Sequence, residues 1–214
     1  MFKLAIFDLD GVVVNTIPLH FQAWKRMFSE YQKEFTFQDY IDKVDGIAGI
    51  DGARNILTDI PFEELKKATE RKYKYYLELL TSRQIPVFED TLAFIKTLKV
   101  ADKKIALISS SRNCREIVEK AKISSLFDCI VTTFEVKKGK PNPDIFLLAA
   151  DQLAVTTDEA VVFEDAVLGI EAALSAKMVA IGVDRYNLPS RLSKADKVIN
   201  GFSQMTLSSL EELF

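Results

Sequence analysis

Short, nearly continuous apolar runs of strand length recur along this 214-residue chain, and segments with helical periodicity separate most of them. A continuous apolar run indicates a strand covered on both faces, because an exposed face would bring alternating polar residues. Strands that alternate with helices form parallel sheets with helices on both faces. The sequence therefore predicts an α/β fold with a doubly wound, Rossmann-like parallel sheet. The expected strands are residues 3–8, 104–110, 128–133, 160–165 and 178–183, and the expected helices between them are residues 112–122, 142–153 and 166–176.

The segment from residue 16 to residue 82 interrupts this alternation. It contains no convincing buried strand, and its apolar residues recur at helical spacing instead, as at Phe21, Trp24 and Phe28. Prolines interrupt helix near both of its ends. We therefore expect a helical cap domain inserted after the first strand. The expected domains are an α/β core of residues 1–15 and 83–214 and a cap of residues 16–82.

Composition narrows the classes of function. Charged residues make up 28% and the net charge is -3, so the chain lacks the broad basic field that nucleic-acid binding requires. No apolar run approaches the roughly 20 residues of a membrane span, and acidic residues follow the N-terminal run too soon for a signal peptide. Two cysteines and one histidine are too few for a disulfide framework or a zinc site. We expect a cytoplasmic monomer that binds neither nucleic acid nor membranes.

Polar side chains that suit phosphate chemistry follow four of the expected strands. Ligands of an open parallel sheet bind beyond the carboxyl ends of its strands, so we expect these side chains at one edge. Neighbouring carboxylates repel one another unless a cation joins them, and oxygen ligands favour Mg²⁺. A lysine and hydroxyl-bearing turns suit a phosphate. The residues are Asp8 and Asp10 after the first strand, Ser109, Ser110 and Asn113 after the second, Lys140 after the third, and Glu164 and Asp165 at the end of the fourth.

This arrangement predicts a phosphoryl-transfer site. Asp8 can attack phosphorus, and Asp10 can handle the proton of the leaving or entering oxygen. Each piece by itself has a simpler explanation: the two aspartates as a helix cap or solvated turn, "SSSRN" as a helix cap, and "KKGK" as a solvated loop. The occurrence of all pieces in order, each after its own strand, favours the site.

The motifs resemble those of the haloacid dehalogenase superfamily, and more closely its β-phosphoglucomutase-like branch, over nearly the whole chain. "FDLDGVVVNT" is similar to the nucleophile motif, and "LISSSRN", "GKPNPDIF" and "VVFEDAVLGIEAA" are similar to the second, third and fourth motifs. The resemblance implies an aspartyl-phosphate intermediate, a mobile cap over the site, and phosphate chemistry rather than dehalogenation. The implied roles are Asp8 as nucleophile, Asp10 as acid and base, Ser109 and Lys140 as phosphate holders with Ser110 and Asn113 nearby, and Asp8, Asp10, Glu164 and Asp165 around the magnesium ion.

Three cap residues are expected to contact the substrate. His20 and Trp24 are four residues apart and therefore share one helix face, and "HFQAWK" resembles the cap helix of the mutases. Lys72, in "ERKYKYY", falls where sugar-phosphate mutases have a substrate lysine. A packed histidine and a solvated lysine are the alternatives.

One departure from the resemblance bears on the reaction. The mutases carry a cap arginine three residues after a glycine, and it grips the phosphate that is not transferred. Here Gly49 occupies that place, and Arg54 follows five residues later. Loss of a bidentate clamp weakens the handling of a bisphosphate, whereas hydrolysis needs no second grip. The sequence therefore predicts a magnesium-dependent phosphatase acting on a small phosphorylated metabolite, a sugar phosphate, with a β-phosphoglucomutase-type phosphomutase and a non-catalytic phosphometabolite binder as alternatives.

Overall fold

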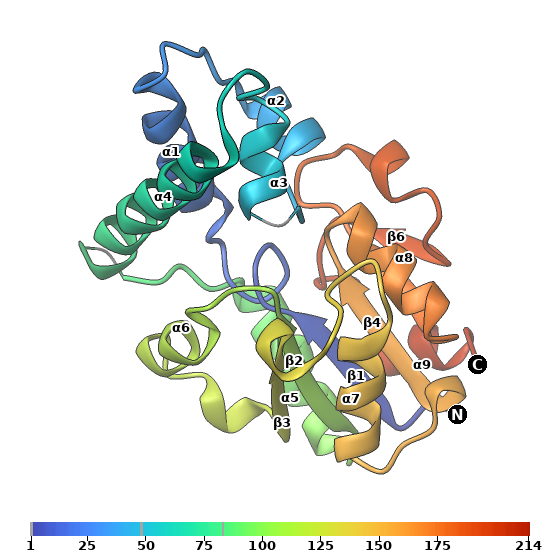
Figure 1. The fold of residues 1–214 in the computed structure, drawn as a ribbon. Helices are drawn as coiled ribbons and strands as arrows, with labels where there is room; N and C mark the ends of the chain where they lie inside the picture. Colours follow the sequence, from blue (N-terminus) through green and yellow to red (C-terminus); the bar gives the residue numbers. More distant parts are fainter. Residues whose placement is uncertain (1, 48, 83) are drawn as a thin grey trace. The chain divides into compact units, whose positions relative to one another are not determined.

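The structure is a computed structural model that describes residues 2–47, 49–82 and 84–214, and its strands form one parallel sheet. In these residues it has six strands in the order β3-β2-β1-β4-β5-β6 (Figure 1). In the middle of the sheet, Leu4 of β1 pairs with Lys104 of β2 on one side and with Ala160 of β4 on the other. The strand order therefore reverses between β1 and β4, which is where open α/β sheets bind their ligands. The strands are β1 (Leu4–Asp8), β2 (Lys104–Ser109), β3 (Cys129–Thr132), β4 (Ala160–Glu164), β5 (Val179–Val183) and β6 (Lys197–Ile199).

Different helices cover the two faces of the sheet. Successive residues of a strand point to opposite faces. Ile6 belongs to the same buried cluster as Phe146 of α7 and Ile170 of α8, whereas the next residue, Phe7, stacks on Phe163 with ring centroids 4.7 Å apart. Phe163 in turn contacts Phe94 of α5 edge to face, so α5 lies on the face opposite α7 and α8 (Figure 1). The α-helices that follow residue 85 are α5 (Glu89–Val100), α6 (Cys114–Lys120), α7 (Asp144–Gln152), α8 (Val167–Ser175) and α9 (Leu207–Glu211).

The predicted doubly wound parallel sheet is confirmed, with differences at the ends of its elements. Each of the five predicted strands begins or ends within one residue of the predicted bounds. The sixth strand, β6, was missed because three residues are too short to show periodicity. Helix α6 begins at Cys114 rather than at residue 112, since the preceding residues form the turn that leaves β2.

The chain divides into two compact units, Met1–Asn15 with Pro86–Phe214, and Thr16–Ile85. In the second unit α1 packs along α4, and Arg26 of α1 pairs with Glu78 of α4 at 2.8 Å. Helix α2 begins with a capping box, in which Thr36 and Asp39 each accept a hydrogen bond from the other's backbone amide. The described residues of this unit form helices and turns only: α1 (Ile17–Ser29), α2 (Phe37–Lys43), α3 (Gly49–Arg54) and α4 (Phe62–Ser82).

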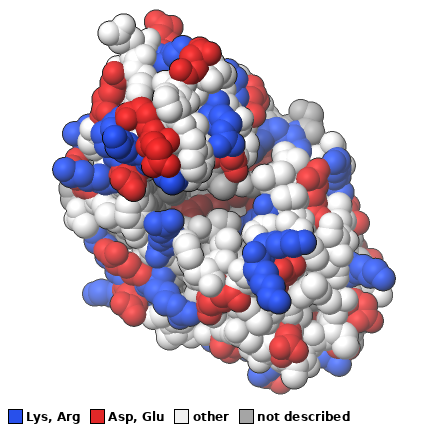
Figure 2. All heavy atoms as spheres, in the orientation of Figure 1, with Lys and Arg blue, Asp and Glu red and all other residues white. Residues whose placement is uncertain are grey.

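The surface carries charges of both signs. On the face drawn in Figure 2, basic and acidic side chains are interspersed over each unit rather than separated by sign. Among the helices that the structure describes, none has both the length and the apolar character needed to cross a membrane.

Candidate active site

A buried ammonium group joins two carboxylates at the carboxyl end of the sheet. Asp8 is the last residue of β1, and Glu164 is the last residue of the neighbouring strand β4. Lys140, on the loop that follows β3, donates a hydrogen bond to Oδ1 of Asp8 at 2.5 Å and a second one to Oε1 of Glu164. None of the three side chains is more than 9% exposed. The first and third predicted motifs therefore meet the fourth in one hydrogen-bonded group.

The carboxylate of Glu164 is held on its other side by the start of α8. Its Oε2 accepts a hydrogen bond from the backbone amide of Ala166 at 3.0 Å. Gly169 leaves room for this carboxylate, because a Cβ atom there would lie 2.0 Å from Oε1 of Glu164. Both oxygens of Glu164 are thus engaged, and its orientation directs the negative charge at Lys140.

The electrostatics of this group leave an excess of negative charge. Burial raises the pKa of Asp8 well above its usual range, and although Lys140 lowers it, the nearby Glu164 and Asp10 raise it again. Burial alone would lower the pKa of Lys140, but Asp8 and Glu164 outweigh burial and raise it, so the ammonium stays charged. One lysine therefore faces several carboxylates, an arrangement that a further cation would stabilise.

The turn after β2 brings hydroxyl and amide groups to the same edge. Asp8 pairs in register with Ile108, so the fully buried Ser109 is the next residue along the adjacent strand. Its hydroxyl accepts a hydrogen bond from the amide of Ser111 at 2.9 Å. Asn113 is buried and makes no side-chain capping bond to α6, so its side chain does not act as the helix cap considered above. Ser110, by contrast, is exposed.

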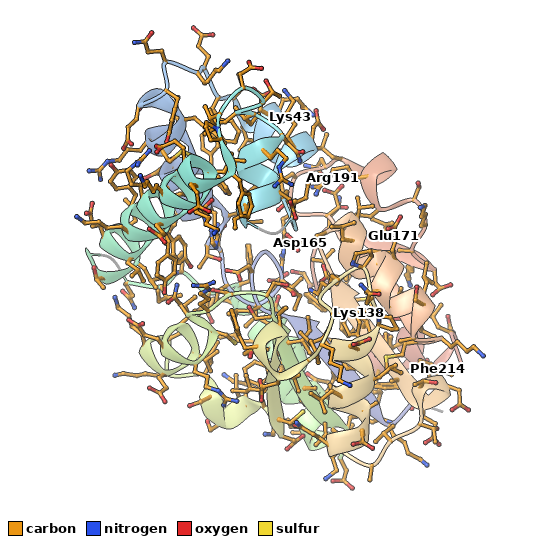
Figure 3. The ribbon with its side chains drawn as sticks, viewed as in Figure 1. Lys43, Lys138, Asp165, Glu171, Arg191 and Phe214 are labelled. Atoms are coloured by element: carbon orange, nitrogen blue, oxygen red, sulfur yellow. The ribbon has the colours of Figure 1, made fainter. Side chains whose placement is uncertain are left out.

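The remaining two aspartates of the predicted set lie on the loops that follow β1 and β4. Asp10 is half-buried, and its charge adds to the larger effect of burial in raising the pKa of Asp8. Asp165 is also half-buried and lies between β4 and α8 (Figure 3). Within the described ranges, no three histidine, cysteine or acidic side chains are gathered closely enough to hold a metal ion by themselves.

The three predicted cap residues form a cluster within their own unit. Nζ of Lys72 on α4 lies 3.0 Å from Nδ1 of His20 on α1. The same ammonium lies over the ring of Trp24, 5.0 Å from its centroid, and over that of Tyr76 at 5.3 Å. Because an ammonium group only donates hydrogen bonds, Nδ1 of His20 is the acceptor in this contact. Lys72 is therefore half-buried among aromatic rings rather than extended into solvent.

Two groups beside the predicted residues were not predicted. Tyr76 stacks on His20 with ring centroids 4.1 Å apart, and its position four residues after Lys72 on one helix could have signalled it. Cys114 hydrogen-bonds Ser109, and burial, with Asp10 and Asp8 adding to it, raises the pKa of its thiol to about 12. No sequence pattern marks Cys114.

Gly49, which the resemblance to the mutases puts where a clamp arginine is expected, is the first residue of α3. Arg54, at the other end of α3, pairs with Asp51 on the same helix at 2.9 Å. Its guanidinium also lies 5.9 Å from the ring centroid of Phe62. Arg54 is therefore engaged within the cap by its own neighbours.

Comparison with known proteins gives consistent matches over the whole chain. The model of haloacid dehalogenase-like hydrolases matches residues 5–183. A Bacillus subtilis protein named beta-phosphoglucomutase is 34% identical over 220 residues, 98% of this chain and 94% of that protein. A Thermotoga maritima protein named phosphorylated carbohydrates phosphatase is 33% identical over 181 residues, 81% of each chain. The crystal structure of beta-phosphoglucomutase from Clostridium difficile superimposes with a TM-score of 0.86 at 29% identity, covering 99% of this chain and 96% of that one.

Proposed function

The chain belongs to the haloacid dehalogenase superfamily, in its β-phosphoglucomutase-like branch, and from this premise we propose that it is a magnesium-dependent sugar-phosphate phosphatase. Membership makes it a phosphoryl-transfer enzyme. The observation that carries the proposal is the buried ion pair of Lys140 with Asp8 at the carboxyl end of β1. It supplies a fixed carboxylate for attack and a positive charge for the phosphate in one place.

The first half of the reaction forms an aspartyl-phosphate. Lys140 holds one oxygen of Asp8, and the other oxygen attacks the phosphorus of the substrate. The bond between phosphorus and the sugar oxygen breaks, and Asp10 donates a proton to that oxygen as it leaves. The Ser109 hydroxyl and the ammonium of Lys140 hold the phosphoryl oxygens during the transfer.

The second half transfers the phosphoryl group to water. Asp10, now ionised, accepts a proton from a water molecule as the water oxygen attacks phosphorus. The bond between phosphorus and Asp8 breaks, phosphate leaves, and both aspartates return to their starting states. Asp10 thus serves once as acid and once as base, which fits its half-buried place on the loop beside Asp8.

The donor set at this edge fits Mg²⁺. Burial, with Glu164 and Asp10 adding to it, raises the pKa of Asp8, so a cation would stabilise its charged form, and the donors are carboxylate oxygens. In phosphoryl-transfer sites Mg²⁺ is bound by protein carboxylates together with water and substrate phosphate, so a complete cage of protein ligands is not needed. Asp8, Asp10 and Asp165 would hold it, with Glu164 beside them. When bound, the ion offsets the charge that builds up on the phosphoryl group.

A phosphomutase is the second candidate, and the cap cluster favours it. The half-buried His20 and Lys72, which lie beside the buried ring of Trp24, give the cap polar groups suited to a sugar phosphate. A mutase must also grip the second phosphate of a bisphosphate, and Gly49 offers no side chain for that grip. The missing grip favours hydrolysis, because water then competes for the phosphoenzyme.

A panel of sugar phosphates tests both candidates. The protein is assayed with Mg²⁺ for release of inorganic phosphate and for formation of the isomeric sugar phosphate, with Asp8→Asn as the control for contaminating activity. We expect phosphate release from at least one hexose phosphate, absent in Asp8→Asn and in excess chelator. Isomer formation in excess of phosphate release would establish the mutase instead, and neither product from any member of the panel would overturn the proposed function.

A further inference from the structure

The loop that carries Asp10 is held from outside by the first residues of α5. Within the loop, the amides of Val13 and Val14 both bond the carbonyl of Leu9, at 3.0 and 2.9 Å. Gly11 has a φ of 80°, a left-handed conformation that a side chain would strain. The carbonyls of Val12 and Val13 point out of the loop, and the second accepts a hydrogen bond from the amide of Phe88 at 3.0 Å.

The carbonyl of Val12 is held by the side chain of Thr91. Thr91 is fully buried, and its hydroxyl donates to this carbonyl at 2.8 Å. The same hydroxyl accepts a hydrogen bond from Nη2 of Arg185 at 2.8 Å. A hydroxyl has one proton, and the donor-only guanidinium occupies one of its lone pairs. Arg185 therefore orients the hydroxyl so that its proton is directed at Val12.

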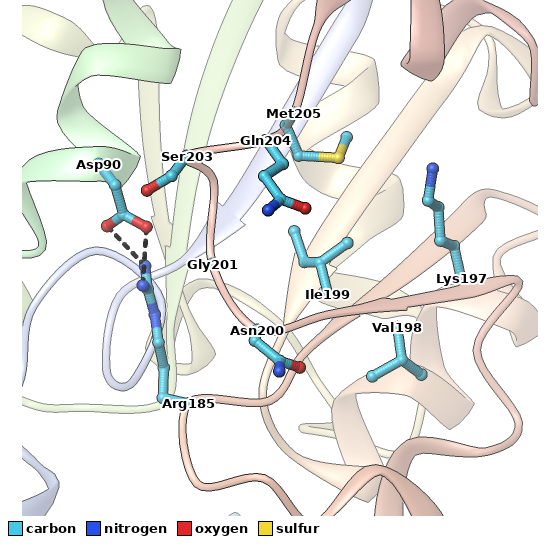
Figure 4. A pocket seen from close by; sticks show the side chains of 10 residues that line it. All are labelled: Asp90, Arg185, Lys197, Val198, Ile199, Asn200, Gly201, Ser203, Gln204 and Met205. Carbon is cyan, nitrogen blue, oxygen red and sulfur yellow. Dashed lines mark hydrogen bonds and ion pairs between the residues drawn. The ribbon is translucent and has the colours of Figure 1, made fainter.

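Arg185 is itself fixed in place. It forms a bidentate pair with Asp90 at 2.8 and 3.0 Å (Figure 4), and its guanidinium lies 4.1 Å from the ring centroid of Phe88. The amide of Phe202 donates to Oδ2 of Asp90 at 2.8 Å. Gly201 admits no side chain, because a Cβ atom there would lie 2.7 Å from both Nη1 of Arg185 and Oδ2 of Asp90.

The same ion pair lines a hollow of about 610 Å³ beside β6, so it is connected to solvent on one side and to the buried Thr91 on the other. The segments that follow β5 and β6 thus meet the start of α5 at the hydroxyl of Thr91. This hydroxyl donates its hydrogen bond to the loop that carries Asp10. A bidentate guanidinium–carboxylate pair is rigid in a way that lysine cannot reproduce.

We propose that Thr91, oriented by the pair of Arg185 and Asp90, is a positioning residue that fixes the loop of Asp10 for proton transfer. The inference rests on the proposed function for the role of Asp10, and on the hydrogen bonds alone for the restraint of the loop. Thr91 acts through Val12, two residues after Asp10. Small displacements of a reacting group reduce rates strongly, because proton transfer needs hydrogen-bond distance.

Thr91→Val removes the hydroxyl and keeps the shape, and Thr91→Ser restores the hydroxyl. Thr97→Val is the matched control, since Thr97 is an exposed threonine of the same helix that bonds only its own helix, at the carbonyl of Ala93. The readout is kcat/KM for the hexose phosphate of the panel that is hydrolysed best, whose leaving oxygen needs a proton, divided by kcat/KM for p-nitrophenyl phosphate, whose leaving group does not. We expect this ratio to fall about tenfold in Thr91→Val, as misplacement of a catalytic group predicts, and to remain near the wild-type value in the other two variants.

Backbone amide hydrogen exchange of residues 9–14 gives a readout that needs no activity. We expect faster exchange in Thr91→Val and unchanged exchange in Thr91→Ser and Thr97→Val. An equal loss of kcat/KM for both substrates, with loop exchange unchanged, would overturn the inference. If the wild-type protein released no phosphate, only the proposed function would be refuted. The hydrogen-exchange rates of residues 9–14 would still show whether Thr91 restrains the loop. If Thr91→Val does not fold, Arg185→Lys leaves Thr91 in place and should show the same pattern.

Discussion

The Cγ2 methyl of Thr69 lies 2.8 Å from the position that a Cβ atom would take at Gly49. A side chain at residue 49 of α3 would therefore displace the methyl of Thr69 on α4. An arginine at residue 49 is accordingly combined with a second change that removes this methyl.

We expect the double variant Gly49→Arg/Thr69→Ser to shift the products towards isomerisation. Thr69→Ser removes the methyl and keeps the hydroxyl that bonds the carbonyl of Leu65 at 2.8 Å. Charge-assisted hydrogen bonds contribute about 1.5–3 kcal/mol, enough to prolong the stay of a bisphosphate roughly tenfold or more. The measurement is glucose 6-phosphate formed against phosphate released from β-glucose 1-phosphate with a bisphosphate primer. Thr69→Ser alone is the control, and a wild-type ratio well above one would contradict the role given to Gly49.

Asp10→Asn should trap the phosphoenzyme formed from p-nitrophenyl phosphate, whose leaving group needs no proton from Asp10. The amide has nearly the same shape but cannot accept a proton from water, and positioned acid–base groups contribute about 10²–10⁴-fold to such steps. Rapid-quench experiments should therefore show phosphate bound to the protein that disappears more slowly than in wild type. Asp151→Asn, at an exposed position of α7, should behave as wild type. Unchanged breakdown in Asp10→Asn would remove Asp10 from the mechanism.

Removal of Asp165 should raise the magnesium requirement. Asp165→Ala takes one oxygen donor from the proposed ion site, so half-maximal activity should need more Mg²⁺, and excess chelator should abolish activity in every variant. Glu171→Gln is the control, on the helix α8 that follows Asp165, where Glu171 pairs with Lys194 at 2.6 Å. Full activity of wild type in excess chelator would show that no divalent ion takes part.

Gly169→Ala should damage both stability and activity. Alanine favours a helix interior over glycine by about 1 kcal/mol, so propensity alone predicts stabilisation. The added Cβ would lie 2.0 Å from the carboxylate of Glu164, however, and such overpacking costs about 1–3 kcal/mol. The displaced carboxylate would also release Lys140. Urea unfolding and phosphate release test this, with Gly52→Ala in α3 as the control, where the nearest atom lies 3.3 Å away. If Gly169→Ala were more stable than wild type and fully active, the expected clash with the carboxylate of Glu164 would be contradicted.

The pair of Asp90 with Arg185 should make stability depend on pH. Burial alone would raise the pKa of Asp90, but hydrogen bonds from Arg185 and the amide of Phe202 outweigh burial and lower it. A carboxyl group whose pKa is lower in the folded state stabilises that state above its unfolded pKa of about 3.9, and this contribution is lost as the pH falls further. The difference in unfolding free energy between wild type and Asp90→Asn should therefore shrink from pH 7 to pH 3. Glu63→Gln, at an exposed site, should show no such change.

The sheet could be predicted because its strands are buried on both faces and read as apolar runs. Asp8, Ser109 and Glu164 could be placed at one edge because the carboxyl ends of parallel strands coincide. Strand β6 has three residues and shows no period, so only its pairing with β5 defines it.

Contacts between distant side chains could not be predicted. Gly49 reads as a lost arginine in the sequence, while its close approach to the methyl of Thr69 depends on how α3 meets α4. The bond from Thr91 to Val12 joins residues far apart in the chain, and Thr91 belongs to no motif. Helical spacing placed His20 beside Trp24, but the approach of Lys72 requires the packing of α1 on α4.

The central place of β1 in the sheet has a consequence for how the protein is made. Leu4 pairs with Lys104 and Ala160, so a ribosome must add roughly a hundred residues before β1 meets either neighbour. At about 5–20 residues per second, that strand remains unpaired for several seconds, whereas the helices of residues 16–85 depend on nearer contacts and can fold during the wait. We therefore expect the nascent chain to carry a folded cap while Asp8 still lacks the lysine and the strands that make it a nucleophile, so that catalytic competence is the last property the polypeptide acquires.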